Sequence, residues 1–528
     1  MTSVLRQSRV VLALLIISSR DALSISQNQP LFDLLEIRVD GNSVLEQRAV
    51  EKIIYPYLGP QKSIDAVEQA RQALEKLYRD NGYSTVLVEI PEQDVVDGLV
   101  RLKVVEGTVE NLKVSGSRYY SLGKITDKIP ALAAGSVPHM PSVQQQMADL
   151  SKESTDRQII PIFRAGSTPG KTEVELKVKD ELPLHGGVEI NGNNSQSTTR
   201  TRLISSLRYD NLWQKFHSAS LQFQTSPENN QEVEVWSGTY VLPTGWEDTR
   251  LALYGIGISS NTQLGASVGG MSVVGTGSIY GARLIKPLAT LESYQHSFLL
   301  GFDHKSFDQA MGLQGQDKQS SPISYPVFQL GYDGSWRGDS HQTSLSSALH
   351  FAVRGMGTDA AQFYDRRFKA KPDFAYISSE LKHLQEIFLD MRLSARLSGQ
   401  VANGPLISNE QFSAGGMQSV RGYHQTQQLG DDGVNLSFEW QSPQLVKTEW
   451  DFAQGLRAHA FVDYAYLRIR DALPTNPDYY TLAGTGLGLR WQLIKHFVGQ
   501  LDWAYPLYRQ GVVGVGDQRV DFRLAYEF

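Results

Sequence analysis

Two stretches of the chain come close to motifs of enzyme active sites. The segment GSTPGKT holds Gly166, Gly170 and Lys171, which approach the phosphate-binding pattern GxxxxGK[ST], but the two glycines stand one residue too close together. The segment also joins two expected strands, whereas a phosphate-binding loop leads from a strand into a helix. We therefore interpret it as a hairpin turn.

A serine between two glycines and the histidines give no better site. Ser267, between Gly265 and Gly269, matches the GxSxG pattern of serine hydrolases, yet no helical pattern follows and it falls in an expected loop. The 11 histidines show no HExxH or other ligand spacing, and the chain has no cysteine. The sequence predicts that the protein is not an enzyme and has no metal or cofactor site.

One pair of charged residues remains as a candidate site. Arg421 belongs to the motif VRGY, which comprises Val420, Arg421, Gly422 and Tyr423. The motif lies in the segment 401–431, which is too long for a simple turn. Asp463 forms a second motif, FVD, with Phe461 in a segment where apolar and polar residues alternate. A guanidinium group can hold a carboxylate with two hydrogen bonds, so Arg421 and Asp463 are candidate partners.

The element that must position this pair is a membrane-spanning β-barrel. After about residue 183 the helical period is lost, and sixteen alternating segments follow, separated by Gly, Asn, Asp or Pro. They begin near His185, Thr201, His217, Glu232, Thr249, Gly277, Tyr294, Tyr325, His341, Phe374, Ile387, Gly433, Leu456, Leu482, His496 and Val520. In the segment from Ile387, an apolar set (Leu389, Met391, Leu393, Ala395, Leu397) alternates with polar residues that include Arg392 and Arg396. One such face suits lipid and the other a wet lumen.

Alternation also predicts which residues face the lumen. Around Asp463, the residues Ala458, Ala460, Val462, Tyr464 and Tyr466 are expected to face lipid, and His459, Phe461 and Asp463 the lumen. A carboxylate inside a barrel needs a cation or water, which Arg421 supplies if its loop folds inward. In the last segment the apolar set is Val520, Phe522, Leu524, Tyr526 and Phe528. We expect this segment to be the sixteenth strand and to pair with the first.

The bulk composition agrees with a barrel. No uninterrupted apolar run after the first two dozen residues approaches the ~20 residues of a spanning helix, and the mean hydropathy is -0.29. The net charge is -6 without a basic cluster, so no nucleic-acid partner is predicted. Residues 1–24 have the pattern of a signal peptide: Arg6 and Arg9, an apolar core at 10–17, and small residues near Ser24.

Two related segments precede the barrel. Ile37 to Asn42 (IRVDGN) resembles Leu112 to Ser117 (LKVSGS), with Gly41 and Gly116 75 residues apart, and VRLKV near Lys103 resembles VELKV near Lys177. Each copy shows the order strand, helix, helix, strand, strand. In the first, an apolar helical face is followed by Asn81-Gly82, and strands are expected at 84–90 and 99–105. The predicted domains are 31–107, 108–181 and a barrel over 182–528. A sheet covered by helices on one face leaves a strand edge that can bind an extended chain.

Together these features resemble the two-partner secretion transporters, the haemolysin-activator and filamentous-haemagglutinin transporter family. The resemblance rests on the duplicated small domains, the sixteen strands, VRGY in the sixth surface loop and the Phe461–Asp463 motif on strand thirteen. It implies α+β POTRA domains in the periplasm, followed by an all-β barrel in the outer membrane. The alternative is an outer-membrane assembly factor or insertase, and a small-molecule porin is a third, weaker possibility.

The resemblance also implies roles for residues and partners. Arg421 would anchor the sixth loop inside the lumen, with Asp463 as its partner. The unfolded start of a large secreted exoprotein would bind the POTRA edges, and export would draw on folding of that exoprotein outside the cell. The aromatic end (Phe522, Leu524, Tyr526, Phe528) resembles the signal that barrels present to the barrel-assembly machinery. Some members carry an N-terminal helix that plugs the pore. We expect none here, because about ten residues separate the signal from the first strand and crossing a membrane takes ~20.

Overall fold

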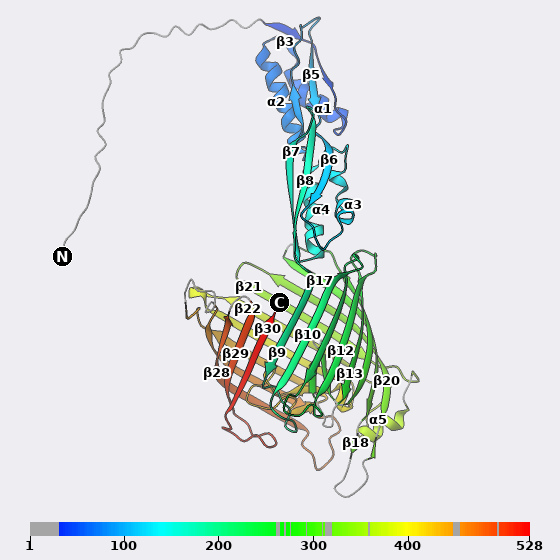
Figure 1. The fold of residues 1–528 in the computed structure, drawn as a ribbon, viewed down its shortest axis with the longest axis vertical. Coiled ribbons are helices and arrows are strands. Elements are labelled where there is room, and N and C mark those ends of the chain that lie inside the picture. The colour runs from blue at the N-terminus through cyan, green and yellow to red at the C-terminus, as the bar shows by residue number, and fades with distance from the viewer. Residues whose placement is uncertain are drawn as a thin grey trace, which may run out of the picture. The chain divides into compact units, whose positions relative to one another are not determined.

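The computed structural model describes residues 31–528, except for 260–264, 269–270, 275, 292, 309, 312–318, 321, 357–358, 447–454 and 494–495. The expected signal peptide and the question of a plug helix fall on residues 1–30 and so lie outside the described residues. The chain divides into two compact units, which meet in sequence at Asp180 and Glu181 (Figure 1).

The first unit begins with a small α/β fold, a three-stranded sheet with two helices. Its three-stranded sheet has the order β2 (Glu36–Asp40), β5 (Leu99–Val105), β4 (Leu87–Glu89), with β2 parallel to β5. The helices α1 (Gln47–Ile54) and α2 (Ile64–Asp80) and the short helix η1 (Tyr55–Tyr57) connect β2 to the rest, and β1 (Phe32–Leu34) pairs with β3 (Gly59–Lys62). Helix α2 buries Val67, Ala70, Leu74 and Tyr78 at helical spacing. It ends where predicted, because Gly82 adopts a positive φ of 86° that favours glycine.

A second three-stranded sheet with helices follows, with the same strand arrangement. Its sheet has the order β6 (Thr108–Ser115), β8 (Lys171–Asp180), β7 (Arg157–Ala165), again with a parallel pair, β6 and β8. The helices are α3 (Leu122–Asp127), η2 (Pro130–Leu132) and α4 (Met140–Glu153). Gly166 and Gly170 lie in the turn between β7 and β8, and no helix follows them, so the phosphate-loop pattern is a hairpin turn as expected. Across the described residues, none of the helices combines the length and the apolar character needed to span a membrane.

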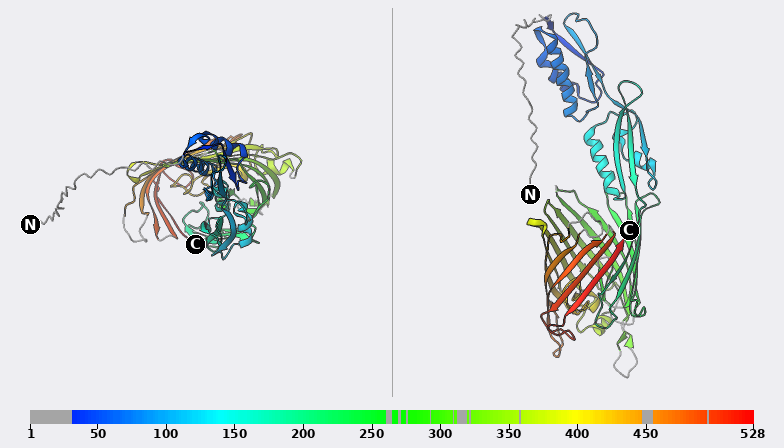
Figure 2. Two further views of the ribbon diagram at one scale, coloured as in Figure 1. Left: turned by 90° about the horizontal axis from the view of Figure 1, so that it is seen from above. Right: turned by 60° about the vertical axis from the view of Figure 1, so that its left-hand side comes forward.

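The second unit is a closed antiparallel barrel of sixteen strands, which confirms the predicted fold class (Figure 2). The first eight strands are β9 (Leu184–Asn191), β10 (Arg202–Leu212), β11 (His217–Thr225), β12 (Glu234–Pro243), β13 (Arg250–Ser259), β16 (Thr276–Pro287), β17 (Tyr294–Asp308) and β20 (Ile323–Arg337). The other eight are β21 (His341–Phe351), β22 (Ala375–Glu386), β23 (Arg392–Ala402), β26 (Asp432–Gln441), β27 (Arg457–Arg468), β28 (Tyr479–Leu493), β29 (Phe497–Pro506) and β30 (Arg519–Glu527).

Short elements lie in the loops at the end of the barrel opposite the start of β9 and the end of β30 (Figure 1). They are the hairpins β14 (Gly265–Val268) with β15 (Met271–Val274) and β18 (Ala310–Met311) with β19 (Gln319–Ser320), and the helix α5 (Ala360–Arg366). Ser267 therefore lies in a hairpin between β13 and β16, in the loop where it was expected, and β15 follows it rather than a helix.

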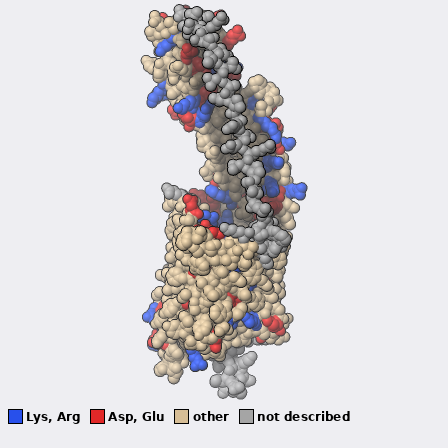
Figure 3. Space-filling model, turned by 90° about the vertical axis from the view of Figure 1, so that its left-hand side faces the viewer, with Lys and Arg blue, Asp and Glu red and all other residues tan. Residues whose placement is uncertain are grey.

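The strands alternate as predicted. On β27, Val462, Tyr464 and Tyr466 are exposed on the outer face, while Phe461 and Asp463 are buried inside. Uncharged side chains cover most of the barrel wall, and charged side chains are more frequent toward its two ends (Figure 3). This is the distribution that a hydrocarbon layer around the middle of the wall requires.

The predicted start of one strand is wrong. Alternation placed the eleventh strand from Ile387, but β23 begins at Arg392 and a turn, η3 (Phe388–Asp390), precedes it. Leu389 and Asp390 have positive φ values of 58° and 60°, and an ion pair to Arg457 (Asp390 Oδ2 to Nη2, 2.8 Å) holds the turn. Leu389 and Met391 therefore continue the alternating pattern in sequence without belonging to the strand.

The seam that closes the barrel is short. β30 pairs with β9 as expected, but through five residue pairs only, from Arg523 opposite Asn191 to Glu527 opposite Gly187. No other neighbouring pair in the described barrel has fewer than eight. Phe528 lies one residue beyond β30, and its backbone N–H and carbonyl both bond to Gly186, at 2.9 and 3.0 Å.

Candidate functional site

The sixth loop, residues 403–431 between β23 and β26, carries structure of its own. It contains the short helix η4 (Ser408–Glu410) and a hairpin of β24 (Phe412–Ala414) and β25 (Gln428–Gly430). We call residues 403–411 the outer segment and residues 415–427 the inner segment. The inner segment contains the motif VRGY and lies in the lumen against β26 to β29.

Arg421 and Asp463 meet in this region. Arg421 donates from Nε to Asp463 Oδ2 at 2.8 Å and from Nη2 to Oδ1 at 2.9 Å, and its backbone N–H also donates to Oδ2 at 3.1 Å. Arg421 is 4% exposed and Asp463 is fully buried. A bidentate, charge-assisted pair of this kind fixes both the position and the orientation of the loop.

Two further carboxylates and an aromatic ring surround the same guanidinium. Nη1 of Arg421 donates to Glu439 Oε2 at 2.8 Å and lies 3.8 Å from Asp502 Oδ2. The guanidinium carbon lies 3.5 Å from the centre of the Phe461 ring, a cation–π contact that places the first residue of the FVD motif beneath the charge. The two motifs of the sequence therefore form one cluster.

The charge balance of the cluster favours an ionised arginine. Burial by itself lowers the pKa of Arg421, but the hydrogen bonds and charges of Asp463 and Glu439 outweigh it and hold that pKa above its ordinary value. Arg490 pairs with Glu439 from the other side (Nη1 to Oε1, 2.7 Å), so a second cation compensates part of the negative charge. Removing Arg421 would leave the buried carboxylates of Asp463 and Glu439 without the cation between them.

Glycines on β28 make room for this cluster. Gly484, Gly486 and Gly488 alternate along β28 and stand opposite Asp463, Phe461 and His459 of β27. A Cβ on Gly484 would lie 2.1 Å from the carbonyl oxygen of Arg421, and one on Gly486 would lie 2.6 Å from the Phe461 ring. The loop backbone and the ring occupy the space that side chains would fill elsewhere.

The other residues of VRGY bind the neighbouring strand ends. Gly422 has a φ of 95°, which glycine adopts readily, and packs against Pro506 at the end of β29. The Tyr423 hydroxyl lies 2.7 Å from the Tyr508 carbonyl oxygen and 3.1 Å from that of Ala483. Val420 is fully buried in an apolar cluster, the inner cluster, that comprises Ala414, Val420, Tyr423, Ala465, Leu467, Leu482 and Val513.

Two carboxylates of the site, Glu439 and Asp502, were not identified from the sequence. His459 was expected to face the lumen, and it does, with Nε2 2.7 Å from Asp502 Oδ1. Glu439 stands between Phe438 and Trp440, and Asp502 between Leu501 and Trp503. A lone carboxylate between apolar neighbours is the signal that could have found both. The alternating glycines of β28 are a second such signal.

The aromatic chain end lies apart from the loop. Leu524, Tyr526 and Phe528 are 46%, 38% and 51% exposed, and Phe522 of the same alternating set is partly exposed. The structure therefore does not bring these four residues into contact with the cluster around Arg421. Their outward apolar face is continuous with the barrel wall.

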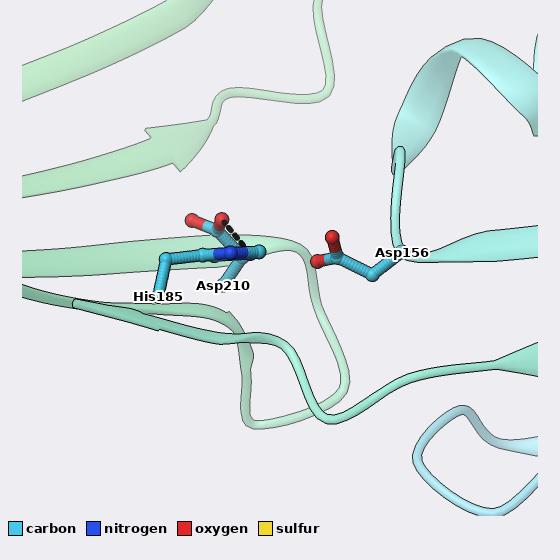
Figure 4. A group of neighbouring side chains, drawn as sticks. All are labelled: Asp156, His185 and Asp210. Atoms are coloured by element: carbon cyan, nitrogen blue, oxygen red, sulfur yellow. Dashed lines mark ion pairs between the residues drawn. The ribbon is translucent and has the colours of Figure 1, made fainter. Parts of the chain in front are cut away.

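A second histidine–aspartate pair stands near the start of the barrel. His185 of β9 and Asp210 of β10 form an ion pair, with 3.5 Å between His185 Nε2 and Asp210 Oδ2 (Figure 4). Structural zinc sites in proteins take four side-chain ligands, so this pair by itself does not constitute one.

Comparison with known proteins places the chain. Residues 32–107 match the family model of the ShlB-type POTRA domain, and residues 170–491 match that of the haemolysin secretion/activation proteins ShlB/FhaC/HecB. The outer membrane transporter CdiB of Dickeya dadantii is 24% identical over 454 residues, 79% of this chain and 74% of that one. The heme/hemopexin transporter protein HuxB of Haemophilus influenzae is 20% identical over 399 residues, 74% of this chain and 68% of that one.

Solved structures show the same fold. CdiB from Escherichia coli superimposes with a TM-score of 0.61 at 19% identity and covers 97% of this chain and 93% of that one. BamA from Haemophilus ducreyi, lacking POTRA domains 1–3, gives a TM-score of 0.57 at 14% identity, covering 94% of this chain and all of that one, which is a likeness of fold alone. The secretion/activation family model spans more than half of the chain. The chain therefore belongs to the haemolysin secretion/activation family ShlB/FhaC/HecB, the two-partner secretion transporters of the outer membrane.

Proposed function

We propose that this transporter recognises one large exoprotein through two periplasmic POTRA domains, residues 31–107 and 108–181, and exports it through the barrel, residues 182–528. The observation that carries the proposal is the loop that the buried Arg421–Asp463 pair holds across the lumen, in a chain that also matches the POTRA family model. The family model for haemolysin secretion/activation proteins and the relatives named outer membrane transporter CdiB and heme/hemopexin transporter protein HuxB support a large secreted partner of the haemolysin or adhesin type.

The sheet edges of the first unit support recognition of an extended chain. In each sheet one edge strand, β2 or β6, lies parallel to the central strand and offers its outer side. On the opposite edge of the second sheet, β7 contains Pro161, which has no N–H to donate, and in the first sheet β4 has three residues only. We infer that the exoprotein's unfolded start pairs with β2 or β6.

Co-expression with the exoprotein tests this recognition. A barrel lacking residues 31–181 should assemble yet leave the exoprotein inside the cell, because nothing presents the unfolded chain to the lumen. The exoprotein is measured in the medium and in the periplasm, and barrel assembly by the heat-dependent shift in gel migration. Undiminished export by the truncated protein would contradict the proposal.

In the proposed mechanism the sixth loop, predicted as 401–431 and shortened to 403–431 because β23 includes residues 401 and 402, is the gate of the lumen, and Arg421 is its anchor. Arg421→Asp places a carboxylate against Asp463 and Glu439, so the loop cannot dock and export should be lost. Arg337→Asp, at the exposed end of β20, is the matched control and should export normally. An Arg421→Asp barrel that assembles and still exports at the control's rate would show that the pair only steadies the wall.

The chain end is proposed to serve assembly. The outward aromatic set that ends at Phe528 is suited to recognition by the barrel-assembly machinery, and the apolar outer wall to outer-membrane lipid. Deleting Phe528 should lower the amount of inserted barrel before it affects exoprotein binding. Phe497→Ala, on the same outer face of β29, is the control for loss of one exposed ring. Equal insertion of the deletion variant and this control would refute the role.

Residues 1–24 are proposed to direct this chain across the inner membrane as a signal peptide.

The energy source of exoprotein export is the remaining part of the proposal. No enzymatic activity, cofactor or nucleic acid takes part in the proposed mechanism, so folding of the exoprotein outside the cell would supply the driving force. An exoprotein variant that cannot fold should then stall in the lumen rather than accumulate in the periplasm.

A further inference from the structure

Glu410 is a buried carboxylate in the outer segment of the sixth loop, and its side chain has no exposed surface. Lys305 Nζ of β17 lies 2.7 and 3.0 Å from its two oxygens. The hydroxyl of Tyr325 on β20 donates to Oε1 at 2.6 Å, and that of Tyr376 on β22 donates to Oε2 at 2.8 Å. Three different strands therefore bind one loop residue, and none of them contributes to the site around Arg421.

Apolar packing surrounds this contact. Leu406 and Ile407 of the outer segment are 1% exposed and belong to an apolar cluster, the outer cluster, with residues of β12 to β22 and of helix α5. Near them, Arg366 of α5 donates to Asn409 Oδ1 at 3.3 Å. Because water is excluded, a charged pair here is costly to break.

The other end of the loop is fixed to the same place. Asp431, fully buried, accepts hydrogen bonds at 2.8 Å from the backbone N–H of Leu406 and at 2.9 Å from Gln411 Nε2. Arg367 pairs with it at 2.8 Å. The base of the loop thus holds together without any contribution from Arg421.

The inner segment packs elsewhere. Val420 and Tyr423 belong to the inner cluster, with residues of β27 and β28, and the inner and outer clusters share no residue. At the two ends of the inner segment, Gly415 and Gly416 have φ values of 114° and 98°, and Thr426 has a φ of 53°. These backbone conformations, two of them at glycines, mark the points where the inner segment can turn while its base stays fixed.

We propose that Glu410 is a second positioning residue of the gate: it fixes the outer segment to β17, β20 and β22, so that release at Arg421 frees only residues 415–427. The inference rests on the proposed role of Arg421. Only residues 415–427 then move out of the lumen, while residues 403–411 stay bound to the barrel wall. The fixed base returns the VRGY motif to Asp463 after each export event.

Cysteine reporters test the two segments separately, because the chain has no cysteine of its own. Ile407→Cys reports the outer cluster and Val420→Cys the inner cluster, each through its rate of maleimide labelling in the assembled barrel. Arg421→Ala should raise labelling at the inner reporter by about tenfold or more and leave the outer reporter within about twofold. Glu410→Gln should raise labelling at the outer reporter by a similar factor, because the Lys305 ammonium loses its partner.

Controls separate a local change from a misfolded barrel. Glu386→Gln, at the exposed end of β22, makes the same chemical change outside the loop and should alter neither reporter. Glu410→Asp keeps the charge and should recover part of the outer protection. Equal exposure of both reporters in Arg421→Ala would show that the loop moves as one body, which overturns the inference.

A stalled exoprotein supplies the functional measurement. With a non-folding exoprotein held in the lumen, the inner reporter should label rapidly and the outer reporter should stay protected. Exposure of both would overturn the inference while the role of Arg421 stands. If neither becomes exposed, the loop stays docked during export, and both the inference and the proposed gating role fail.

Discussion

Two parts of the lumen wall differ in the side chains they present. The inner face of β26 to β29 carries Glu439, Asp463, Asp502 and the glycines of β28, all of them in or beside the loop site. The inner faces of β11 and β12 carry small or neutral polar side chains, namely Ser220, Gln222, Ser237 and Thr239, and β10 adds Ser206 and the charged Arg208. These line a cavity of about 1000 Å³, which Met417 and Gln418 of the inner segment and the charged Glu189 and Arg523 of the seam strands also border.

The two walls suit different tasks, one the binding of the sixth loop and the other contact with an extended chain. Buried charges bind only a partner that matches them, so the charged wall suits a fixed loop. Hydroxyl and amide groups bond to water and to any peptide about equally, so the neutral wall suits an extended chain of varied sequence. An extended chain in the lumen would meet mainly uncharged groups along β11 and β12, and the charged wall would reach it only through the loop.

The largest effect is expected from Asp463→Asn. The amide keeps the shape but removes the charge that faces Arg421, and loss of one partner from a buried pair costs about 3–5 kcal/mol. Labelling of Val420→Cys should rise more than about tenfold, and the exoprotein in the medium should fall accordingly. Asp333→Asn, whose carboxylate accepts from Ser346 on an exposed part of β20, is the control and should change neither.

Gly484→Ala should have the next largest effect. The added methyl would lie 2.1 Å from the Arg421 carbonyl oxygen, a distance that forces the loop backbone to move. The control is Gly238→Ala on the outer face of β12, whose methyl would meet nothing closer than 4.0 Å. Export and Val420→Cys labelling are compared for the two. Equal values would mean that the glycines of β28 do not serve the loop.

Glu439→Gln should have a smaller effect. Arg421 keeps both hydrogen bonds to Asp463, and the group left without its charge partner, Arg490, is 39% exposed and can turn to water. Labelling of the inner reporter should rise by about threefold, less than for Asp463→Asn. A rise in labelling as large as that of Asp463→Asn would show that Glu439 of β26 contributes as much to holding the loop as Asp463 of β27 does.

The smallest effect is expected on the neutral wall. Gln222→Glu adds a charge beside the cavity, where water can solvate it, so docking of the loop and export should both stay within about twofold of the parent. Thr239→Val, which removes a hydroxyl without adding charge, serves as its companion. A loss of export as large as that of Gly484→Ala would show that this wall makes specific contacts.

Much of the barrel could be predicted because its period is simple. Alternation assigned both faces of β27 correctly and found the start of most strands within two residues, since lipid and lumen impose opposite requirements on neighbouring residues. It failed at β23, where Leu389 and Met391 continue the pattern through a turn whose left-handed residues carry no sequence signature. In the first unit, β4 is shorter than the expected strand at 84–90.

The site was only partly predictable. Arg421 and Asp463 could be paired because one motif lies in a long loop and the other on an inward face. Their neighbours could not, because Glu439 and Asp502 reach the guanidinium across two different strands. The partners of Glu410 lie 34 to 105 residues away, and which wall the outer segment packs against depends on how the loop folds.

The short seam between β9 and β30 gives the barrel a mechanical property. Two neighbouring strands that share fewer backbone hydrogen bonds than the other pairs resist separation less than those pairs do. Beyond Asn191 one more backbone bond joins the two edges, from Gly192 N–H to the Phe522 carbonyl at 2.9 Å, and after it side chains connect them, as in the bond of 2.6 Å from Arg519 Nη2 to Asn194 Oδ1. The inner segment adds a tie of its own, since Gln425 donates its N–H to the Asn194 carbonyl at 2.9 Å and His424 Nδ1 lies 3.0 Å from Arg519 Nη1. The docked loop therefore also links the two edges of the barrel's shortest strand pairing.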